Sequence, residues 1–156
     1  MSAPLDATDL ALLRLLAADA GRPASQLGRD LGLSQPAAWR RVQRLYERGV
    51  IAGRVLDLNV EKLGFGVTVF LGIKLASKGQ MRLEDFERAV TAIPEVQRVQ
   101  HVLGVYDYRL RVVARDLADF ERVLRRRIMA LPGVGSIEAN VLLSEERRPG
   151  PLEAGS

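Results

Sequence analysis

The sequence predicts an α+β protein with a helical N-terminal domain over residues 1–62 and a mixed domain over residues 63–146. Apolar residues recur at helical spacing through the first part of the chain, and they alternate at strand spacing from about residue 67. A repeat within the second half indicates that the mixed domain contains two similar units. Residues 147–156 contain proline and glycine with almost nothing to bury, so a mobile tail is expected there.

Three helices are expected in the first domain. Asp6 and Asp9 have the spacing of a capping box ahead of the first helix. A shorter helix is expected from about 24 to 31, and a third over 35–48, with Ser34 as its N-cap.

The second and third expected helices are joined by a tight turn, Gly32-Leu33-Ser34. Two helices joined in this way and preceded by a third form the helix-turn-helix arrangement, whose last helix enters the major groove of DNA. Residues 50–58 read as extended chain, with Gly53 as a bend, and would form a wing. The first domain is therefore predicted to be a winged helix-turn-helix.

The second domain is expected to follow the order strand, helix, strand, strand, helix, strand. Its strands are expected over residues 67–75, 96–103, 106–113 and 134–143. The apolar faces of its helices are Leu83, Phe86, Val90 and Ile93 in the first helix, and Leu117, Phe120, Leu124, Ile128 and Leu131 in the second. This order is the split βαββαβ arrangement of a ferredoxin-like domain.

The repeat supports this topology. Residues 85–88 (Asp-Phe-Glu-Arg) recur at 119–122, and the pattern of 92–99 recurs at 130–137, so the second copy is four residues longer between its matching blocks. Four residues make about one helical turn, so the insertion is expected to keep the same helix face buried. Each copy is then one strand–helix–strand unit.

Composition removes several classes of function. The chain has no cysteine and a single histidine, His101, which excludes disulfides, thiolate metal sites and multi-histidine zinc sites. We expect His101 to pack or to lie at an interface, and we expect no metal, cofactor or catalytic residue. No apolar run is long enough to span a membrane and residues 1–9 do not resemble a secretory signal, so a cytoplasmic protein is expected.

The positive charge gathers on the third expected helix. The chain carries 23 basic and 19 acidic residues, a net charge of +4. Arginine and glutamine are the side chains that read guanine and adenine edges in the major groove. The candidate DNA-binding residues are Ser34, Gln35, Pro36, Trp39, Arg40, Arg41, Gln43 and Arg44. A solvated amphipathic helix without a nucleic-acid partner is the alternative, and Trp39 could equally pack against its own domain.

Several motifs in order along the chain carry a family resemblance. They are Leu5-Asp6-x-x-Asp9, Gly21-Arg22, Gly32-Leu33-Ser34, Arg41-Val42-x-Arg44-Leu45, Gly49-Val50-Ile51, Gly104-x-Tyr106-Asp107-Tyr108 and Leu131-Pro132-Gly133-Val134. Together they resemble the Lrp/AsnC family of feast/famine transcription regulators over about residues 5–146. The resemblance implies a DNA-binding regulator, not an enzyme, whose second domain senses a ligand and dimerises. It further implies homodimers that assemble into tetramers or octamers and respond to an amino acid bound between dimers.

By this match, the candidate effector-binding residues are Gly104, Tyr106, Asp107 and Tyr108. Gly104 would allow a close backbone approach, and Asp107 could accept a hydrogen bond from a ligand ammonium. The alternative is that Gly104 and Asp107 build a hairpin turn while the two tyrosines pack. Many members of the family carry threonines where this chain has Ile137 and Ala139, so a more apolar pocket is expected and no ligand role is assigned to these two positions.

Two other functions fit the same architecture. Siroheme decarboxylases resemble this family, but they use histidine- and arginine-bearing motifs in the second domain, where this chain has the segment 104–108 with only His101 nearby. An architectural DNA-binding protein that senses no effector would share the first domain. A screen for ligand-induced stabilisation separates this alternative from a sensing regulator.

Overall fold

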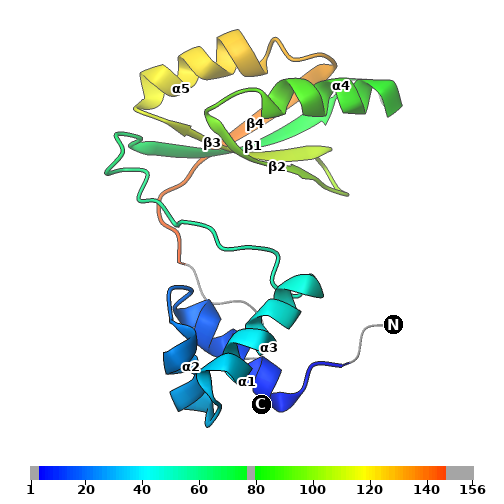
Figure 1. The fold of residues 1–156 in the computed structure, drawn as a ribbon. Coiled ribbons are helices and arrows are strands. Elements are labelled where there is room, and N and C mark those ends of the chain that lie inside the picture. Colours follow the sequence, from blue (N-terminus) through cyan, green and yellow to red (C-terminus); the bar gives the residue numbers. More distant parts are fainter. Residues whose placement is uncertain (1–3, 77–79, 147–156) are drawn as a thin grey trace. The chain divides into compact units, whose positions relative to one another are not determined.

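The computed structural model describes residues 4–76 and 80–146, so the tail expected over residues 147–156 lies outside the described residues. The chain divides into two compact units, one comprising the residues up to Asp57 and the other Leu58–Glu145. Within the described ranges, no helix is both long enough and apolar enough to cross a membrane. Figure 1 shows the three helices of the first unit and the sheet with its helices in the second.

The N-terminal unit consists of α1 (Ala7–Ala18), α2 (Ala24–Leu31) and α3 (Gln35–Glu47). The capping box predicted for α1 is confirmed: the Asp9 amide donates to Asp6 Oδ1 at 2.7 Å, and the Asp6 amide donates to Asp9 Oδ2. At the start of α3, the Ala37 amide donates to Ser34 Oγ at 3.3 Å, as predicted for an N-cap. Local capping chemistry therefore fixes where both helices begin.

Close packing at the turn sets the angle between α2 and α3. A Cβ atom on Gly28 would lie 2.6 Å from the carbonyl oxygen of Leu33, so only glycine fits at this position. Gly32 has φ of 66°, the left-handed conformation that ends α2. The core of the unit forms around Leu12, Leu27 and Leu45. The helix-turn-helix predicted from the sequence is thus present.

The segment expected as a wing differs from the prediction. No strand is assigned over residues 50–58, although the backbone there is not helical. A β-wing requires a second strand to satisfy its backbone groups, and residues 50–58 find no such partner in the part of the chain that the structure describes. The segment is an irregular connection in this structure, and not a β-ribbon.

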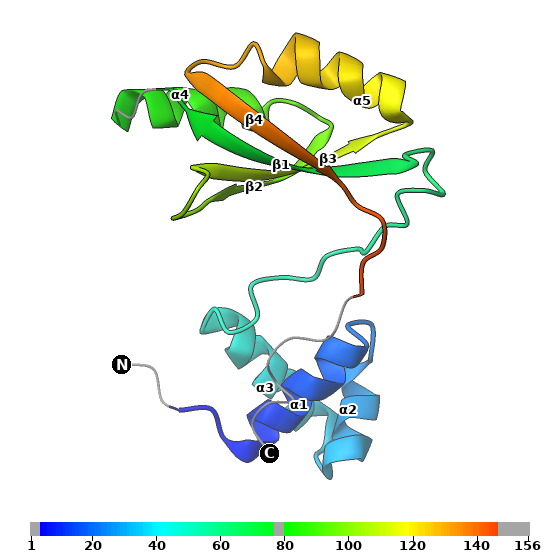
Figure 2. The same cartoon turned by 180° about the vertical axis from the view of Figure 1, so that it is seen from behind.

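The second unit has the predicted βαββαβ order. Its elements are β1 (Val67–Leu75), α4 (Gln80–Thr91), β2 (Val96–His101), β3 (Tyr108–Ala114), α5 (Leu117–Val123), η1 (Leu124–Ile128) and β4 (Val134–Val141). The four strands form an antiparallel sheet in the order β2-β3-β1-β4. Figures 1 and 2 show α4 and α5 on the same face of this sheet, and the other face carries neither helix.

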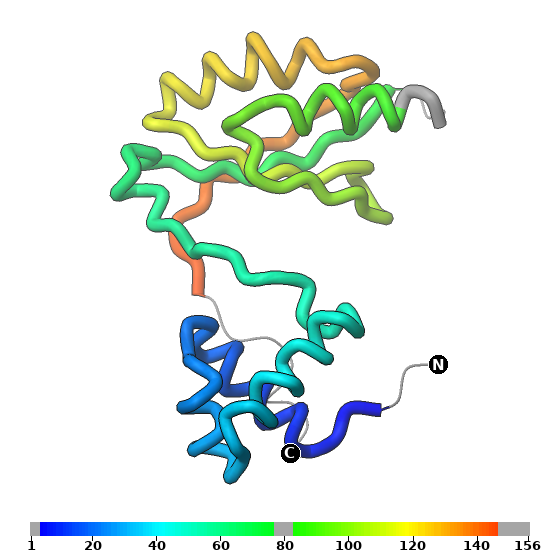
Figure 3. Tube along the Cα trace, in the orientation of Figure 1, coloured from blue at the N-terminus to red at the C-terminus, as the bar shows by residue number. Residues whose placement is uncertain are grey.

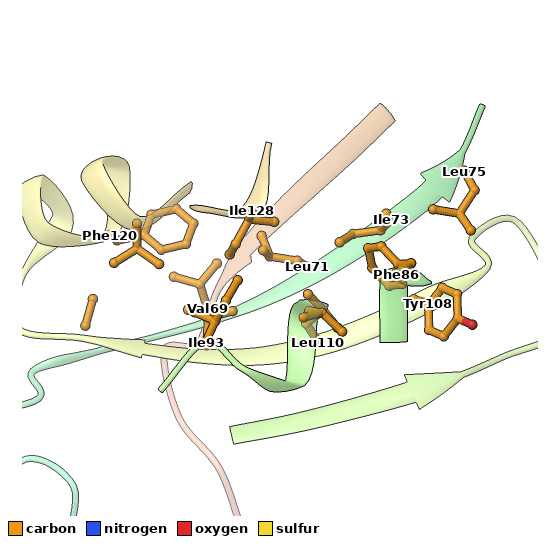
Figure 4. Close-up of a cluster of buried hydrophobic side chains, with 14 residues drawn as sticks. Val69, Leu71, Ile73, Leu75, Phe86, Ile93, Tyr108, Leu110, Phe120 and Ile128 are labelled. Carbon is orange, nitrogen blue, oxygen red and sulfur yellow. The ribbon is translucent and has the colours of Figure 1, made fainter. Parts of the chain in front are cut away.

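The hydrophobic core lies between the helices and the sheet. Figure 4 shows Leu71, Ile73 and Leu110 of the central strands in one cluster with Phe86 and Ile128. One prediction for α5 is wrong, because the side chain of Leu117 is 59% exposed. Leu117 is the first residue after the N-cap Asp116, and the buried face of the helix is formed instead by residues further along, including Val123.

The second repeat copy contains a π-helical turn. The helix α5 continues directly into η1 (Figure 3), where the Met129 amide donates to the Leu124 carbonyl, five residues back, at 2.8 Å. This turn falls within the stretch in which the second copy is four residues longer than the first. The predicted conservation of the buried face holds for Phe120 and Ile128, but the geometry of the extra turn is wider than α-helical.

Candidate nucleic-acid interface and ligand pocket

The outward face of α3 is cationic and largely free of acidic neighbours. Gln35, Pro36 and Arg40 are exposed, and the Trp39 side chain is 55% exposed. Within residues 4–76 and 80–146, Arg40 forms no ion pair with a carboxylate. The first two turns of the helix therefore present polar, aromatic and cationic groups together, which is the combination that contacts base edges and phosphates.

A groove of about 470 Å³ lies beside this face within the N-terminal unit. Trp39 and Gln43 of α3 form one side, and Arg22 and Arg54 contribute from the flanking segments. Arg22 donates to Asp30 Oδ2 at 2.8 Å, so its charge is already paired. Trp39 and Gln43 thus line one groove together with the connection between α1 and α2.

Arg41, one of the candidate DNA-binding residues, is hydrogen-bonded to α1 and its N-cap. Its guanidinium donates to Asp9 Oδ1 and to Asp6 Oδ2, both at 2.7 Å, and the Arg44 guanidinium donates to the same Asp9 oxygen at 3.1 Å. Asp9 is only 1% exposed. The hydrogen bond from Arg41 holds the pKa of Asp6 below its usual range, and the bonds to Asp6 and Asp9 raise the pKa of Arg41. Arg41 is therefore committed to α1, whereas Arg44 keeps about half of its side chain exposed.

These contacts join two signals that the sequence contained separately. Asp6 and Asp9 were recognised as helix caps, and Arg41 and Arg44 as cations of α3, but the pairing across two helices was missed. The buried Asp9 carboxylate therefore has partners on both sides, because it caps α1 and also accepts hydrogen bonds from two arginines of α3. The one sequence signal for this pairing is that Arg41 lies at the border of the buried face of α3, where its side chain can reach another helix.

The second candidate site is a pocket of about 490 Å³ on the sheet face that carries no helix. Its walls come from β1 and β3 and from the connection between β2 and β3. The lining residues are Phe70, Leu71, Gly72, Val102, Leu103, Gly104, Val105, Tyr106, Arg109 and Asn140. In the register of the sheet, Gly72 of β1 lies opposite Arg109 of β3 on one side and opposite Glu138 of β4 on the other. This row of the sheet therefore holds one cation and one anion.

Tyr106 crosses the floor of this pocket. A Cβ atom on Gly72 would lie 2.7 Å from the Tyr106 ring, so the ring rests directly against the glycine. The Tyr106 hydroxyl donates a hydrogen bond to Glu138 Oε2, and the Asn140 amide donates to Glu138 Oε1 at 3.2 Å. The bond to Glu138 raises the pKa of Tyr106, and it also holds the pKa of Glu138 below its ordinary value.

Of the predicted effector residues, Gly104 and Tyr106 line the pocket, whereas Asp107 and Tyr108 do not. Asp107 is buried, and its Oδ2 atom accepts from the Leu75 amide at 2.9 Å, so it joins two strands at their ends. Tyr108 is fully buried and its hydroxyl donates to Glu87 at 2.6 Å; burial raises its pKa. For Asp107 and Tyr108 the structure therefore matches the alternative of packing and turn formation.

His101 is exposed and contacts an aromatic neighbour. Its ring stacks on the ring of Tyr108 with centroids 4.8 Å apart. Sequence reasoning missed the other lining residues of the pocket, among them Phe70, Arg109 and Asn140. Strand alternation can tell which residues share a face of a strand, but which strands meet at the pocket depends on the sheet order, which no local pattern gives.

Two family descriptions match the chain. The description "AsnC-type helix-turn-helix domain" matches residues 5–46, and "Lrp/AsnC ligand binding domain" matches residues 68–152. The proline dehydrogenase transcriptional activator of Rhizobium radiobacter is 34% identical over 146 residues, which is 94% of each chain. An AsnC family transcriptional regulator of Agrobacterium tumefaciens superposes with a TM-score of 0.87 at 31% identity, over 97% of this chain and 100% of the other.

A transcriptional regulator of Neisseria meningitidis, solved as a complex with L-Met, has the same fold, with a TM-score of 0.88 at 24% identity over 94% of this chain and 95% of the other. The helix-turn-helix, the βαββαβ domain and these relatives define the class: this is a DNA-binding transcriptional regulator with a ligand-binding domain, and not an enzyme. The chain belongs to the Lrp/AsnC family.

Proposed function

We propose that this chain is a sequence-specific transcriptional regulator that recognises DNA through α3 and responds to an amino acid bound in the pocket at Tyr106. The observation that carries the first half is the exposed face of α3, where Arg40 has no acidic partner within the described residues and lies beside Trp39 and Gln43. Phosphate contacts from such residues supply affinity, and contacts to base edges supply specificity. A DNA-binding regulator works where the chromosome lies, so the cytoplasm is its expected compartment.

The set of DNA-binding residues is narrower than the sequence predicted. We retain Ser34, Gln35, Pro36, Trp39, Arg40, Gln43 and Arg44, and we assign Arg41 to the packing of α3 against α1. Arg44 serves both roles, because one side of its guanidinium meets Asp9 while about half of its side chain is exposed.

The pocket has the chemistry to hold an amino acid. Arg109 offers a guanidinium that binds carboxylates through paired hydrogen bonds, and it forms no ion pair within residues 4–76 and 80–146. Glu138 does not line the pocket itself, but it is hydrogen-bonded to the lining residues Tyr106 and Asn140 and supplies a nearby carboxylate that attracts an ammonium group. Phe70, Leu103 and Val105 offer apolar surface for a side chain. A zwitterion with an apolar side chain satisfies all three features. The L-Met complex of the Neisseria meningitidis neighbour supports this choice of ligand class.

Assembly completes the proposed mechanism. The pocket opens on the sheet face without helices, and a partly apolar sheet face is commonly covered by a second subunit. We propose a homodimer that associates further into tetramers or octamers, with the effector favouring one assembly over another. Dimerisation would set the spacing between two α3 helices, because helix-turn-helix dimers read half-sites separated by about one helical turn of DNA.

The DNA-binding half is tested with an operator selected from random duplexes. Arg40→Ala is expected to weaken binding by about 1–3 kcal/mol, which is about 5- to 150-fold. If Arg40 contacts a phosphate, the slope of log affinity against log salt concentration should also fall by about 0.9. Arg88→Ala is the matched control, since Arg88 is an exposed arginine of α4 in a surface pair with Asp85. Equal affinity of the Arg40→Ala and control variants would refute the placement.

The sensing half is tested by thermal shift against the twenty amino acids, followed by operator binding for each one that stabilises the protein. Arg109→Gln should abolish the shift, while Arg98→Gln, on the neighbouring strand, should retain it. If no amino acid raises the melting temperature of the wild type, the chain acts on DNA without an effector, as an architectural protein does.

A further inference from the structure

The C-terminal unit contains a second cleft that shares no lining residue with the pocket at Tyr106. Its volume is about 450 Å³, and it lies beside α5 and η1, at the helix-bearing side of the domain. Four arginines line it: Arg115, Arg122, Arg126 and Arg127. The proposed contacts to DNA and to an amino acid use none of them.

The charges of the cleft do not cancel. Arg122 pairs with Asp119, and Arg127 pairs with Glu95 at 2.9 Å. Arg115 and Arg126 form no ion pair in the described ranges, although both line the cleft. The two carboxylates against four guanidinium groups leave a surplus of two positive charges.

Asp119 is held in its ionised form by fixed partners. The Arg115 amide donates to its Oδ2 atom at 3.0 Å, and the Arg122 guanidinium donates to its Oδ1 atom. Both bonds keep the pKa of Asp119 below its ordinary value, and the bond from the Arg115 amide has the larger effect. Both oxygens of the Asp119 carboxylate thus already accept hydrogen bonds, from the Arg115 amide and the Arg122 guanidinium. The guanidinium groups of Arg115 and Arg126 remain available to bind an anion.

The π turn gathers the arginines. In an α-helix, residues five apart point in different directions, whereas the π turn bonds residue i to residue i+5 and brings such residues closer to one face. Arg122 and Arg127 are five apart and line the same cleft, together with Arg126. The first repeat copy has three residues, 89–91, where the second has seven, 123–129, and this longer stretch contains Arg126 and Arg127. Single π turns occur frequently at functional sites.

The remaining wall of the cleft is apolar. Phe65, Pro94 and Val123 line the cleft together with the arginines. A cavity that combines several guanidinium groups with an aromatic ring and other apolar surface suits a ligand that carries several negative charges and a planar group. Arginine binds phosphoryl oxygens with two parallel hydrogen bonds, which makes it the preferred residue for such groups.

We infer that this cleft is a binding site for a small ligand bearing a di- or triphosphate, held by Arg115 and Arg126 and flanked by Arg122 and Arg127. Inorganic pyrophosphate and nucleotides share this chemistry. A nucleotide would also place its base against Phe65. The site is independent of both proposed functions, because its residues lie outside α3 and outside the pocket at Tyr106.

The test is calorimetric titration of the full chain with sodium pyrophosphate and, separately, with ADP, both at 150 mM salt, chosen because about 8 Å of Debye screening suppresses diffuse attraction. Arg115→Ala/Arg126→Ala should weaken pyrophosphate binding at least tenfold. The matched control is Arg88→Ala/Arg125→Ala, which removes the same charge from two exposed arginines that pair with Asp85 and Glu121. The control should bind within twofold of the wild type.

Comparing the pyrophosphate and ADP titrations also shows whether the ligand is a nucleotide or an inorganic polyphosphate. ADP binding tighter than pyrophosphate, with the advantage lost in Phe65→Leu, identifies a nucleotide; equal binding identifies an inorganic polyphosphate. Absence of pyrophosphate and ADP binding to the wild type, or an equal loss in the control variant, overturns the proposal. A loss of operator affinity in Arg115→Ala/Arg126→Ala without any change in pyrophosphate binding overturns it too, because the cleft would then be a DNA contact. Circular dichroism melts of each variant verify that the fold is intact.

Discussion

At the scale of single residues, Asp9 has the most connected position in the N-terminal unit. It caps α1, and it accepts hydrogen bonds from Arg41 and Arg44 of α3. A buried carboxylate is costly unless it is paired, so each of these bonds contributes to keeping α1 and α3 together. The same contacts divide the arginines of α3 into those that hold the domain and those that face outward.

Arg41→Ala is expected to lower the free energy of unfolding by about 1–3 kcal/mol, because Asp9 would lose its closest cationic partner. Arg40→Ala should change it by less than about 0.5 kcal/mol, since Arg40 is exposed and forms no ion pair in the described part of the chain. Chemical denaturation of both variants provides the measurement. A similar loss in the two would contradict the division between structural and outward-facing arginines.

A pH dependence follows from the bond between Tyr106 and Glu138. This bond lowers the pKa of Glu138 below its ordinary value of 4.5, so its stabilising effect is present above that pH and is lost as the pH falls below it. Tyr106→Phe should therefore reduce the melting temperature at pH 7 more than at pH 3. Carbon-detected NMR titration should show the pKa of Glu138 rising toward 4.5 in the variant. An unchanged Glu138 pKa would show that the hydrogen bond does not form in solution.

At the scale of elements, the helices of the N-terminal unit follow directly from local chemistry. Asp6 and Ser34 are strong caps, so the sequence predicts the starts of α1 and α3 correctly. The βαββαβ order also follows from periodicity and from the repeat. The wing, by contrast, depended on a pairing partner for residues 50–58, and extended character in a sequence does not supply one.

The candidate sites were less predictable than the fold. A motif match led to Gly104 and Tyr106, which line the pocket, but it also included Asp107 and Tyr108, which are buried. Strand alternation places consecutive residues on opposite faces, so a run of neighbouring positions cannot all face one ligand. The π turn of η1 was not predictable either. It is defined by hydrogen bonds from each amide to the carbonyl five residues back, and no residue type in the sequence specifies that spacing.

Gly72 gives a test of the pocket at the level of strands. Gly72→Ala would place a Cβ atom 2.7 Å from the Tyr106 ring, so the ring must move, and we expect a loss of stability of about 1–3 kcal/mol. The double variant Gly72→Ala/Tyr106→Ala should show a clearly smaller penalty than the sum of the single changes, which a double-mutant cycle measures. Gly53→Ala is the control, because nothing lies within 4 Å of its Cβ position. Additive effects would mean that the ring does not rest on Gly72.

At the scale of the whole molecule, the open sheet face determines the proposed assembly. Phe70 lies on this face, between Arg111 of β3 and Asn140 of β4 in the register of the sheet. Side chains of the adjacent position, such as Leu71, enter the core beneath the helices instead. One face of β1 therefore packs in the hydrophobic core, and the other face belongs to the proposed assembly surface.

Phe70→Asp is expected to convert the proposed dimer into a monomer, because it would bring two like charges into a desolvated interface. Leu117→Asp is the matched control: it introduces the same charge at an exposed apolar residue on the helix-bearing side. Light scattering at micromolar concentration should show a dimer or larger species for the wild type and the control only. A monomeric wild type would contradict the proposed interface.

The unequal length of the two repeat copies has a consequence for stoichiometry. Halves of equal length would make the C-terminal unit pseudosymmetric, with two equivalent surfaces for any small molecule. Arg126 and Arg127 lie in the stretch 123–129, which is four residues longer than its counterpart 89–91, and the described residues of each subunit form one cleft lined by four arginines. Saturation with pyrophosphate should accordingly occur at one equivalent per polypeptide in every oligomeric form, and a ratio of two would contradict this assignment.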